Sequence, residues 1–345
     1  MWDEIVLVLT IACKLAFKNA SDGWNIKMGA GFMEQKIVIC DCDHKSIEIE
    51  EEVLKKHGYT CDWRRCMTED EVIAGCADAT VLLVQYAKVG RRAMEALPNL
   101  KQIVRYGVGV DTIDLEAARE LGIEVCNVPD YGTFEVADQA MAHTLCLARK
   151  LYMTNADIRK GRWNYADAIP MHRLSVMTVG VIGLGRIGKA YAARMHAFGT
   201  KVIATDELAK DVPDYVTMVP FEELIKQSDI ISIHCPADGN IGLIGEAEFA
   251  MMKDGAYLIN VSRGGIIDEA ALDAALTSGK LAGCGLDVAA KEPIPADHPL
   301  LRHPNLLVSP HIGWYSEESA DELKRKVAEE ALRFVTGEPV HYSVL

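Results

Sequence analysis

The chain has 345 residues, half of them hydrophobic and a quarter charged, which is the composition of a soluble globular protein. This length exceeds one ordinary core, so we expect two domains. The formal charge of −14 argues against nucleic acid or an anionic membrane as a direct partner, although a few arginines could still bind an anionic substrate. The ten cysteines show no C-x-x-C pair and no metal-ligand spacing, which predicts reduced thiols in a cytoplasmic protein and no metal site.

The first residues do not follow the pattern of a folded domain. Ile5–Cys13 is an apolar run too short to span a bilayer, and it follows Asp3 and Glu4 rather than basic residues. Neither a membrane segment nor a signal peptide is therefore expected. The first strand follows Met33–Lys36, so we expect residues 1–32 to be an extension or a poorly ordered tail.

The chain then alternates short apolar runs with helical patterns. Strands are predicted at residues 37–40, 60–63, 79–84, 100–104 and 123–125, and helices at 47–57 and 69–76. This alternation predicts an α/β unit. Its fourth strand leads into Arg105–Asp111, where two glycines expose backbone N–H groups beside an arginine. That combination suits a carboxylate ligand, and a plain turn is the alternative.

Two segments connect this unit to the rest of the chain. Residues 135–151 are rich in alanine and predominantly apolar, which predicts one long helix at a domain or subunit contact. Residues 159–173 are polar and contain Pro170, which is typical of a connecting arm rather than a core element.

Residues 178–206 predict a strand, a glycine turn, a helix and a second strand. In the G-x-G-x-x-G turn, Gly183 permits the tight bend, Gly185 lets the backbone approach a pyrophosphate, and Gly188 allows close packing of the helix on the strand. The helix N-terminus offers unpaired N–H groups to phosphates. Asp206 lies 18 residues after the third glycine, where it would bind the adenosine ribose and disfavour NADP. A structural turn without a nucleotide is the alternative.

The alternation resumes after Asp206. Strands are predicted at residues 230–234, 256–261, 282–288 and 306–308, and helices from 221, at 249–253 and at 269–278. Arg263, Asp287 and His311 each follow the carboxyl end of a strand, which is the edge where open α/β sheets bind ligands. Any one of them alone would be explained by a cap, a turn or solvation.

The chain resembles the D-isomer-specific 2-hydroxyacid dehydrogenases from about Lys36 to its end. The motifs that carry the resemblance are VRYGVGVDTID (104–114), NVPDY (127–131), VGVIGLGRIGKA (179–190), HCPADGNIGLIG (234–245), NVSRGGIIDEAAL (260–272), GLDVAAKEP (285–293) and SPHIGWYSEES (309–319). Within the family it is most similar to the bacterial branch that resembles the C-terminal binding proteins, on the basis of residues 84–88, 135–138 and 314–316.

The resemblance implies a catalytic trio. His311 would be the general acid-base, Glu292 would orient its imidazole, and Arg263 would bind the substrate carboxylate and polarise the carbonyl. The other implied substrate-binding residues are Arg105, Val108, Gly109 and Trp314. The implied NAD-binding residues are Gly183, Gly185, Arg186, Ile187, Gly188, Asp206, Cys235, Pro236, Val261 and Asp287, of which Asp287 would bind the nicotinamide carboxamide.

The resemblance also implies an architecture of two Rossmann-like or flavodoxin-like domains. A discontinuous substrate domain would comprise residues 33–132 and 313–345, with an NAD-binding domain inserted at 133–312. The cofactor domains would form a homodimer. Because the chain stops soon after the substrate domain, we expect no regulatory domain of the kind found in some phosphoglycerate dehydrogenases. Departures from the family pattern are Thr133 and Phe134, Gln139, and Ala289 and Ala290; they affect the expected substrate size.

These features predict an NAD-dependent oxidoreductase that interconverts a small D-2-hydroxy acid and its 2-keto acid by hydride transfer. Neither direct nucleic acid binding nor membrane association is expected. One alternative, from a different class, is an NADH-sensing, corepressor-like scaffold that works by binding partners. Another is a phosphoglycerate dehydrogenase of serine biosynthesis, which differs only in its substrate.

Overall fold

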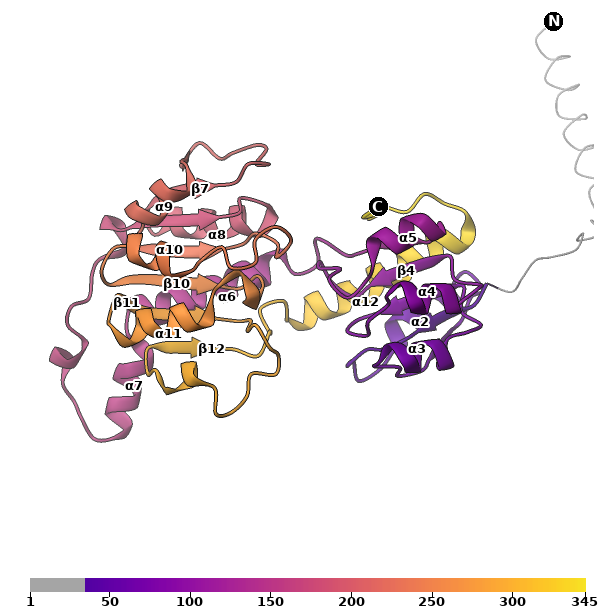
Figure 1. The fold of residues 1–345 in the computed structure, drawn as a ribbon, viewed down its shortest axis with the longest axis horizontal. Coiled ribbons are helices and arrows are strands. Elements are labelled where there is room, and N and C mark those ends of the chain that lie inside the picture. The colour runs from indigo at the N-terminus through magenta and orange to yellow at the C-terminus, as the bar shows by residue number, and fades with distance from the viewer. Residues whose placement is uncertain (1–34) are drawn as a thin grey trace, which may run out of the picture. The chain divides into compact units, whose positions relative to one another are not determined.

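Two parallel β-sheets organise the part of the chain that this computed structural model describes, residues 35–345 (Figure 1). The first sheet has five strands in the order β2-β1-β3-β4-β5, and the second has seven in the order β12-β11-β10-β9-β6-β7-β8. Parallel strands joined through helices confirm the predicted α/β class. The extension or tail predicted for residues 1–32 lies outside the described residues.

The first sheet is buried on both faces. Its strands are β1 Ile37–Ile39, β2 Cys61–Trp63, β3 Val81–Val84, β4 Gln102–Arg105 and β5 Glu124–Cys126. The helices between them are α2 Glu48–Lys55, α3 Glu69–Gly75, α4 Arg91–Ala96 and α5 Leu115–Leu121. All four residues of β3 are buried, which explains why this central strand is a continuous apolar run rather than an alternating one.

The helix α12, Glu317–Thr336, packs on this first sheet although it lies at the other end of the sequence. Figure 1 shows it, in yellow, among the indigo and purple elements that include α2 and β4. Ser316 caps its N-terminus, and Gly337, with φ of 76°, ends it in the left-handed conformation. The sequence prediction missed this helix.

The helix predicted at 135–151 is present but ends at Ala148, and a second helix begins at Leu151. Helix α6 is Thr133–Ala148 and helix α7 is Leu151–Arg159. Lys150 between them has φ of 47°, a left-handed conformation that ends the first helix without glycine or proline. The predicted connecting arm contains the 3-10 turn η1 Tyr165–Ala168, and η2 Leu174–Val176 follows it.

The second sheet contains the glycine turn. Its strands are β6 Thr178–Ile182, β7 Lys201–Thr205, β8 Val216–Met218, β9 Ile230–Ile233, β10 Ala256–Asn260, β11 Leu281–Leu286 and β12 Leu306–Val308. The other elements are α8 Arg186–Ala197, α9 Phe221–Gln227, α10 Glu246–Met251, η3 Gly264–Ile266, α11 Glu269–Thr277 and η4 Pro299–Arg302. Strand β8 was not predicted, and α10 begins three residues before the predicted 249–253.

The strand order positions the site. From β6 the chain proceeds to β7 and β8 on one side, then crosses to β9 and continues to β12 on the other. Ligands of open α/β sheets bind beyond the carboxyl ends of the strands at such a switch point. Helices α6 and α8 cover one face of the sheet, and α9, α10 and α11 cover the other.

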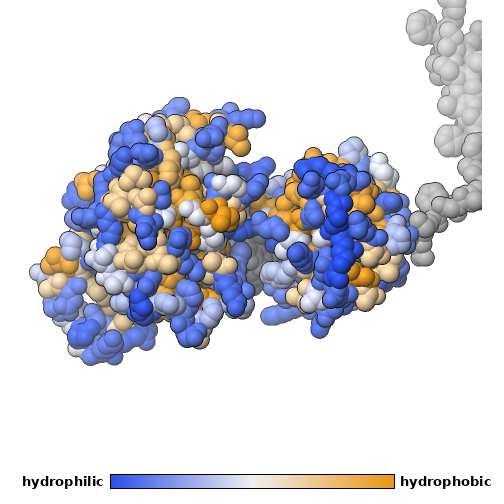
Figure 2. All heavy atoms as spheres, viewed as in Figure 1, coloured by the Kyte–Doolittle hydropathy of each residue, from blue (hydrophilic) through white to orange (hydrophobic). Residues whose placement is uncertain are grey.

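The outer surface is mixed in character. Figure 2 shows hydrophobic residues in patches among hydrophilic ones on the face in view. Across residues 35–345, none of the helices combines the length and apolar composition that crossing a membrane requires. The nine cysteines within this range are all free thiols.

Candidate active site

The glycine turn between β6 and α8 leaves no room for side chains at two of its three glycines. Gly183 has φ of 89°, and a Cβ there would lie 2.6 Å from the Cys235 nitrogen. A Cβ at Gly188 would overlap the Gly183 carbonyl oxygen. Glycine is therefore required at both positions, for the tight bend and for close helix packing.

Gly185 differs from its two neighbours because it faces open space. A Cβ there would have no heavy atom within 4 Å, and the residue is exposed. Gly185 is the N-cap of the 12-residue helix α8, whose first residues are Arg186 and Ile187. The unpaired N–H groups of this first turn and the space above Gly185 fit a pyrophosphate that approaches the backbone.

Asp206, which directly follows β7, is hydrogen-bonded to the backbone of the glycine turn. Its Oδ2 accepts a hydrogen bond from the Leu184 N–H at 2.7 Å, and its Oδ1 accepts one from the Leu208 N–H at 2.8 Å. A carboxylate has about four acceptor positions, so further positions remain for ribose hydroxyls.

The next strand ends add Cys235, Pro236 and Val261 to the same edge. Ser262 Oγ donates a hydrogen bond to the Cys235 carbonyl, which joins the segment after β9 to the segment after β10. Burial raises the pKa of the Cys235 thiol to about 11, so this group is neutral at physiological pH. Pro236 is exposed beside it, and Val261 is buried.

His311 and Glu292 form a direct pair beyond β11 and β12. His311 Nδ1 lies 2.7 Å from Glu292 Oε2, and the Ala289 N–H donates to Glu292 Oε1 at 3.0 Å. Burial acts to raise the pKa of Glu292, but the hydrogen bonds from His311 and Ala289 outweigh it, and the charge of Arg263 also lowers this pKa. The carboxylate therefore stays ionised, and its hydrogen bond directs Nε2 of the imidazole away from Glu292.

Arg263 is fixed by two hydrogen bonds. Its Nε donates to Asp111 Oδ2 at 3.0 Å and its Nη1 to the Ser262 carbonyl at 2.9 Å. A Cβ at Gly109 would overlap Arg263 Nη2, so a side chain there would displace this guanidinium from its position. The structure thus brings the predicted Val108–Gly109 backbone next to Arg263. The Val108 side chain is exposed, and its carbonyl accepts a hydrogen bond from Asn127 Nδ2 at 2.6 Å.

Arg105 lies in a largely enclosed position at the end of β4. Within residues 35–345, no hydrogen bond joins its guanidinium to another residue, and burial lowers its pKa. The charges of Arg105 and Arg263 both act on Tyr131, whose pKa burial raises to about 12. The Tyr131 and Trp314 rings lie 6.1 Å apart between centroids. Tyr131 therefore links two predicted substrate-binding residues, Arg105 and Trp314.

Asp287 directs its carboxylate at the loop that carries His311. The Gly313 N–H donates to its Oδ2 at 2.7 Å, and the Ile312 N–H and Ser309 Oγ donate to its Oδ1 at 3.1 and 2.5 Å. The residue is 2% exposed. These bonds leave about one acceptor position of the carboxylate, on Oδ2, for a nicotinamide carboxamide.

Several residues of this arrangement were not assigned from the sequence. Tyr131 ends the NVPDY motif and Asp111 belongs to VRYGVGVD, so the motifs contained them without indicating their contacts. Ser309 likewise lies within the motif that contains His311, and the motif does not indicate its contacts. His143, which contacts Ser309, carried no signal beyond its place on a predicted helix.

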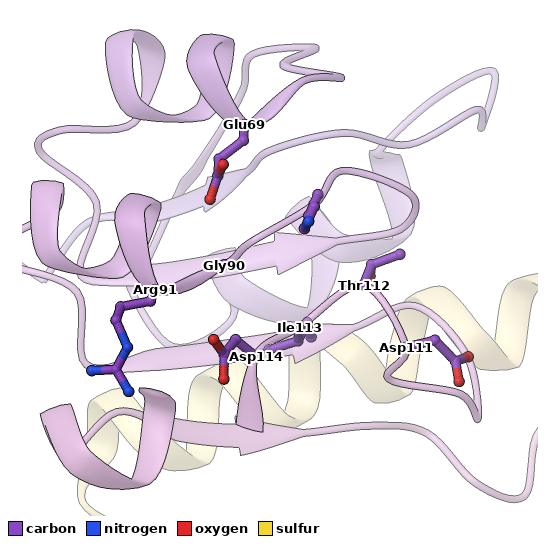
Figure 3. Close-up of a pocket in the computed structure, with 8 residues that line it drawn as sticks. Glu69, Gly90, Arg91, Asp111, Thr112, Ile113 and Asp114 are labelled. Atoms are coloured by element: carbon purple, nitrogen blue, oxygen red, sulfur yellow. The ribbon is translucent and has the colours of Figure 1, made fainter. Parts of the chain in front are cut away.

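A pocket of about 340 Å³ borders the site at Asp111 (Figure 3). Its lining residues are Glu69, Lys88, Gly90, Arg91, Asp111, Thr112, Ile113 and Asp114. In the close-up, Asp111 lies at one end of this group and Arg91 at the other. None of the catalytic trio lines the pocket, so it adjoins the predicted site without containing it. Over residues 35–345, no group of three or more His, Cys, Asp or Glu side chains is arranged to hold a metal ion.

Comparison with known proteins identifies the family. Residues 141–313 match the family model of the D-isomer specific 2-hydroxyacid dehydrogenase, NAD binding domain. The chain is 38% identical to a glyoxylate reductase of Thermococcus litoralis, over 76% of this chain and 81% of the relative. It is 34% identical to a hydroxypyruvate reductase of Blautia hydrogenotrophica, over 79% and 87%. The chain belongs to the D-isomer-specific 2-hydroxyacid dehydrogenases, and it carries their NAD-binding domain.

Longer relatives and solved structures agree with this assignment. The D-3-phosphoglycerate dehydrogenase of Archaeoglobus fulgidus is 37% identical over 84% of this chain, which spans 56% of that relative's length. The chain thus spans a little over half of the phosphoglycerate dehydrogenases it matches. A D-lactate dehydrogenase of Aquifex aeolicus, solved with NAD and lactic acid, superposes with a TM-score of 0.79 at 28% identity, over 88% of this chain and 96% of that one.

Proposed function

We propose that this protein is an NAD-dependent dehydrogenase that interconverts a D-2-hydroxy acid and its 2-keto acid. The observation that carries the proposal is the His311–Glu292 pair, 2.7 Å apart, at the same sheet edge as the glycine turn. Glyoxylate and hydroxypyruvate reductases among the relatives support the same reaction class.

His311 is the proton donor of the reductive direction. Its Nδ1–H donates to the Glu292 carboxylate, which leaves Nε2 to transfer a proton to the substrate oxygen. Glu292 fixes the ring orientation through this hydrogen bond. When bound, the nicotinamide supplies or accepts the hydride.

Arg263 holds the substrate carboxylate. Its Nε donates a hydrogen bond to Asp111 and its Nη1 donates one to the Ser262 carbonyl. Its Nη2, which lies beside the Gly109 backbone, remains available to the substrate. A guanidinium fixed in this way, together with the N–H groups of Val108 and Gly109, suits a planar carboxylate. The same contact polarises the neighbouring carbonyl.

Arg105, Tyr131 and Trp314 form the side of the site that selects the substrate side chain. Within residues 35–345, the Arg105 guanidinium has no hydrogen-bond acceptor, and an enclosed guanidinium gains most from an anionic ligand. This observation favours one second candidate, a phosphoglycerate dehydrogenase activity, because a substrate phosphate would pair with Arg105. Matches to several phosphoglycerate dehydrogenases support the same candidate.

The remaining roles follow the glycine turn. We assign the pyrophosphate to Gly185, Arg186 and Ile187, and the adenosine ribose to Asp206, which favours NAD over NADP. Cys235, Pro236, Val261 and Asp287 would line the rest of the cofactor site. The division into a substrate domain (33–132 and 313–345) and an NAD-binding domain (133–312) is supported by the packing of α12 on the first sheet.

We further propose a cytoplasmic homodimer. Three large side chains in the segment after α7 are exposed to solvent: Trp163, Tyr165 and Ile169 are 89%, 84% and 63% exposed. Apolar side chains gathered in this way mark a protein contact. A second copy of the chain is the proposed partner. Membership of the corepressor-like branch stays a prediction, with partner binding as its test.

The test is oxidation of NADH by the purified protein with a panel of 2-keto acids. The panel comprises pyruvate, hydroxypyruvate, glyoxylate, phenylpyruvate and 3-phosphohydroxypyruvate, with NADPH as the control cofactor. Turnover of at least one member with NADH is expected. Tight NADH binding without turnover of any member would overturn the enzyme proposal and favour the scaffold.

A further inference from the structure

We propose that Gln139, His143, Asp287 and Ser309 form a clamp that positions His311 for proton transfer. These four residues, named here the Ser309 clamp, hold the backbone of the His311 loop, and Asp287 has this role in addition to its proposed contact with the nicotinamide carboxamide. The inference rests on the proposed function, in which His311 is the proton donor. It adds two helix residues, Gln139 and His143, to the machinery that the catalytic trio requires.

The His311 loop needs such support because its central residue is strained. His311 has φ of 53°, a left-handed conformation that non-glycine residues adopt at a cost of about 1–3 kcal/mol when the surroundings hold them there. Its N–H donates to the Asp287 carbonyl at 2.8 Å, and the next two N–H groups donate to the Asp287 carboxylate. One buried aspartate therefore fixes three consecutive backbone groups, beginning with that of the proposed proton donor.

Ser309 connects this aspartate to helix α6. Its Oγ donates to Asp287 Oδ1 at 2.5 Å, because an ionised carboxylate can only accept. The hydroxyl oxygen must then be the acceptor for Gln139 Nε2 at 2.8 Å and for His143 Nε2 at 3.0 Å. His143 then carries its proton on Nε2, so its 3.4 Å contact with Gln139 Nε2 joins two donors and is not a hydrogen bond. In this assignment the hydroxyl donates one hydrogen bond and accepts two, which uses its full capacity.

The clamp residues pack closely against the neighbouring backbone. A Cβ at Gly285 would lie 2.7 Å from the Cβ of His143, so the imidazole rests directly on β11. A Cβ at Gly313 would lie 2.8 Å from Asp287 Oδ2. Burial lowers the pKa of His143, with Asp287 acting in the opposite direction, and the neutral form agrees with a single proton on Nε2.

Loss of the Ser309 hydroxyl should therefore loosen the loop without unfolding the sheet. In Ser309→Ala, Asp287 Oδ1 loses its shortest hydrogen bond, and the donors on Gln139 and His143 lose their shared acceptor. A displacement of about 1 Å at a reacting group can cost on the order of 10²-fold in rate. We expect kcat for keto-acid reduction to fall about 10- to 100-fold, while the KM for NADH changes less than about twofold.

Two further variants separate positioning from general stability. Ser309→Thr keeps the hydroxyl and should restore most of the lost rate. Ser228→Ala is the matched control, because Ser228 is a fully buried serine at the C-terminal end of α9 whose Oγ donates to the Leu224 carbonyl at 2.7 Å, outside the site. Its loss should lower stability and leave kcat unchanged.

The experiment combines kinetics with hydrogen exchange of the Ile312 and Gly313 amides, read from the peptide that contains them. The expected result is faster exchange and lower kcat in Ser309→Ala, recovery of both in Ser309→Thr, and neither change in Ser228→Ala. Unchanged exchange in Ser309→Ala, or faster exchange with full kcat, would overturn the clamp. If the wild-type protein reduces no keto acid, the proposed function fails by that result, and the exchange data alone decide whether the clamp holds the loop.

Discussion

His311 and Glu292 show how two side chains from separate loops acquire one chemical role. The Ala289 N–H and the His311 ring occupy the two oxygens of Glu292, so the carboxylate can accept from Nδ1 in only a narrow range of orientations. The imidazole is thereby oriented from one side by Glu292 and held through its backbone by Asp287. Removal of either support should lower the rate without removing the proton donor itself.

Glu292→Gln tests the first support. Hydrogen bonds hold the pKa of Glu292 below its ordinary value against the effect of burial, so the wild-type carboxylate is charged throughout the neutral range. A rate that depends on this charge is retained at neutral pH and is lost only as pH falls through the lowered pKa of Glu292. We expect Glu292→Gln to lower kcat by about 10- to 100-fold and to remove this acid limb from the pH–rate profile.

Glu223→Gln, on the exposed side of α9, is the control for Glu292→Gln, and it should retain both the rate and the acid limb. A Glu292→Gln protein with the kcat of the wild type would show that the pair does not orient the proton donor.

Helix α12 contributes buried side chains to the hydrophobic core on one face of the first sheet. Its buried residues Leu323 and Val327 belong to the hydrophobic cluster that also contains Ile39 and Val104 of the first sheet. The helix follows the second sheet in sequence but completes the first in space. The chain therefore crosses between the sheets twice: once before the first strand of the second sheet, and once after its last strand.

Leu323→Ala measures this contribution. Leu323 is 2% exposed, and truncation of a buried leucine typically costs about 2–5 kcal/mol because packing is lost and a cavity remains. We expect the free energy of unfolding in urea to fall by that amount. Asp321→Ala, at an exposed position of the same helix, should change it by less than about 0.5 kcal/mol. Equal stabilities of the two variants would show that α12 does not complete this core.

The sequence predicts elements well where burial produces a continuous pattern. Strands β3, β9 and β10 are apolar runs buried along their length, and all three were predicted. Strand β8 was missed because only Val216 of its three residues is buried. Helix α12 was missed because its first residues are polar and its apolar residues are buried by the first sheet, which is distant in sequence.

The candidate site divides in a similar way. The glycine turn and the members of the trio each lie within a local motif, so the sequence alone predicts them as site residues. The contacts of Tyr131, His143 and Ser309 depend on which elements meet in space, and no local pattern specifies them. The same holds for the break at Lys150, where a left-handed residue replaces the glycine that a sequence pattern would recognise.

At the scale of the whole molecule, each sheet contributes the carboxyl ends of its strands to the proposed chemistry. The first supplies Arg105 and the loop that contains Asp111, and the second supplies the glycine turn, Arg263 and His311. The Arg263–Asp111 ion pair, at 3.0 Å, joins residues of the two sheets directly. The substrate carboxylate is therefore proposed to bind where the two sets of loops meet.

The proposed homodimer makes a prediction at the same scale. Light scattering during size-exclusion chromatography should give twice the chain mass of 37.9 kDa. The double variant Trp163→Asp and Ile169→Asp should give the mass of one chain, because it places charges in the proposed contact. Leu208→Asp, at a position 85% exposed outside this segment, should keep the wild-type mass. A wild-type protein with the mass of one chain would contradict the proposal.

The measurement that tests the central claim most directly is NADH oxidation by the wild-type protein and His311→Ala, side by side, with the 2-keto acid that the panel identifies. We predict that His311→Ala lowers kcat by about 10²–10⁴-fold, the usual contribution of a general acid-base. Its Kd for NADH, measured by fluorescence, should stay within about twofold of the wild type. Equal turnover by the two proteins would contradict the assignment of His311 as the proton donor, and with it the proposed mechanism.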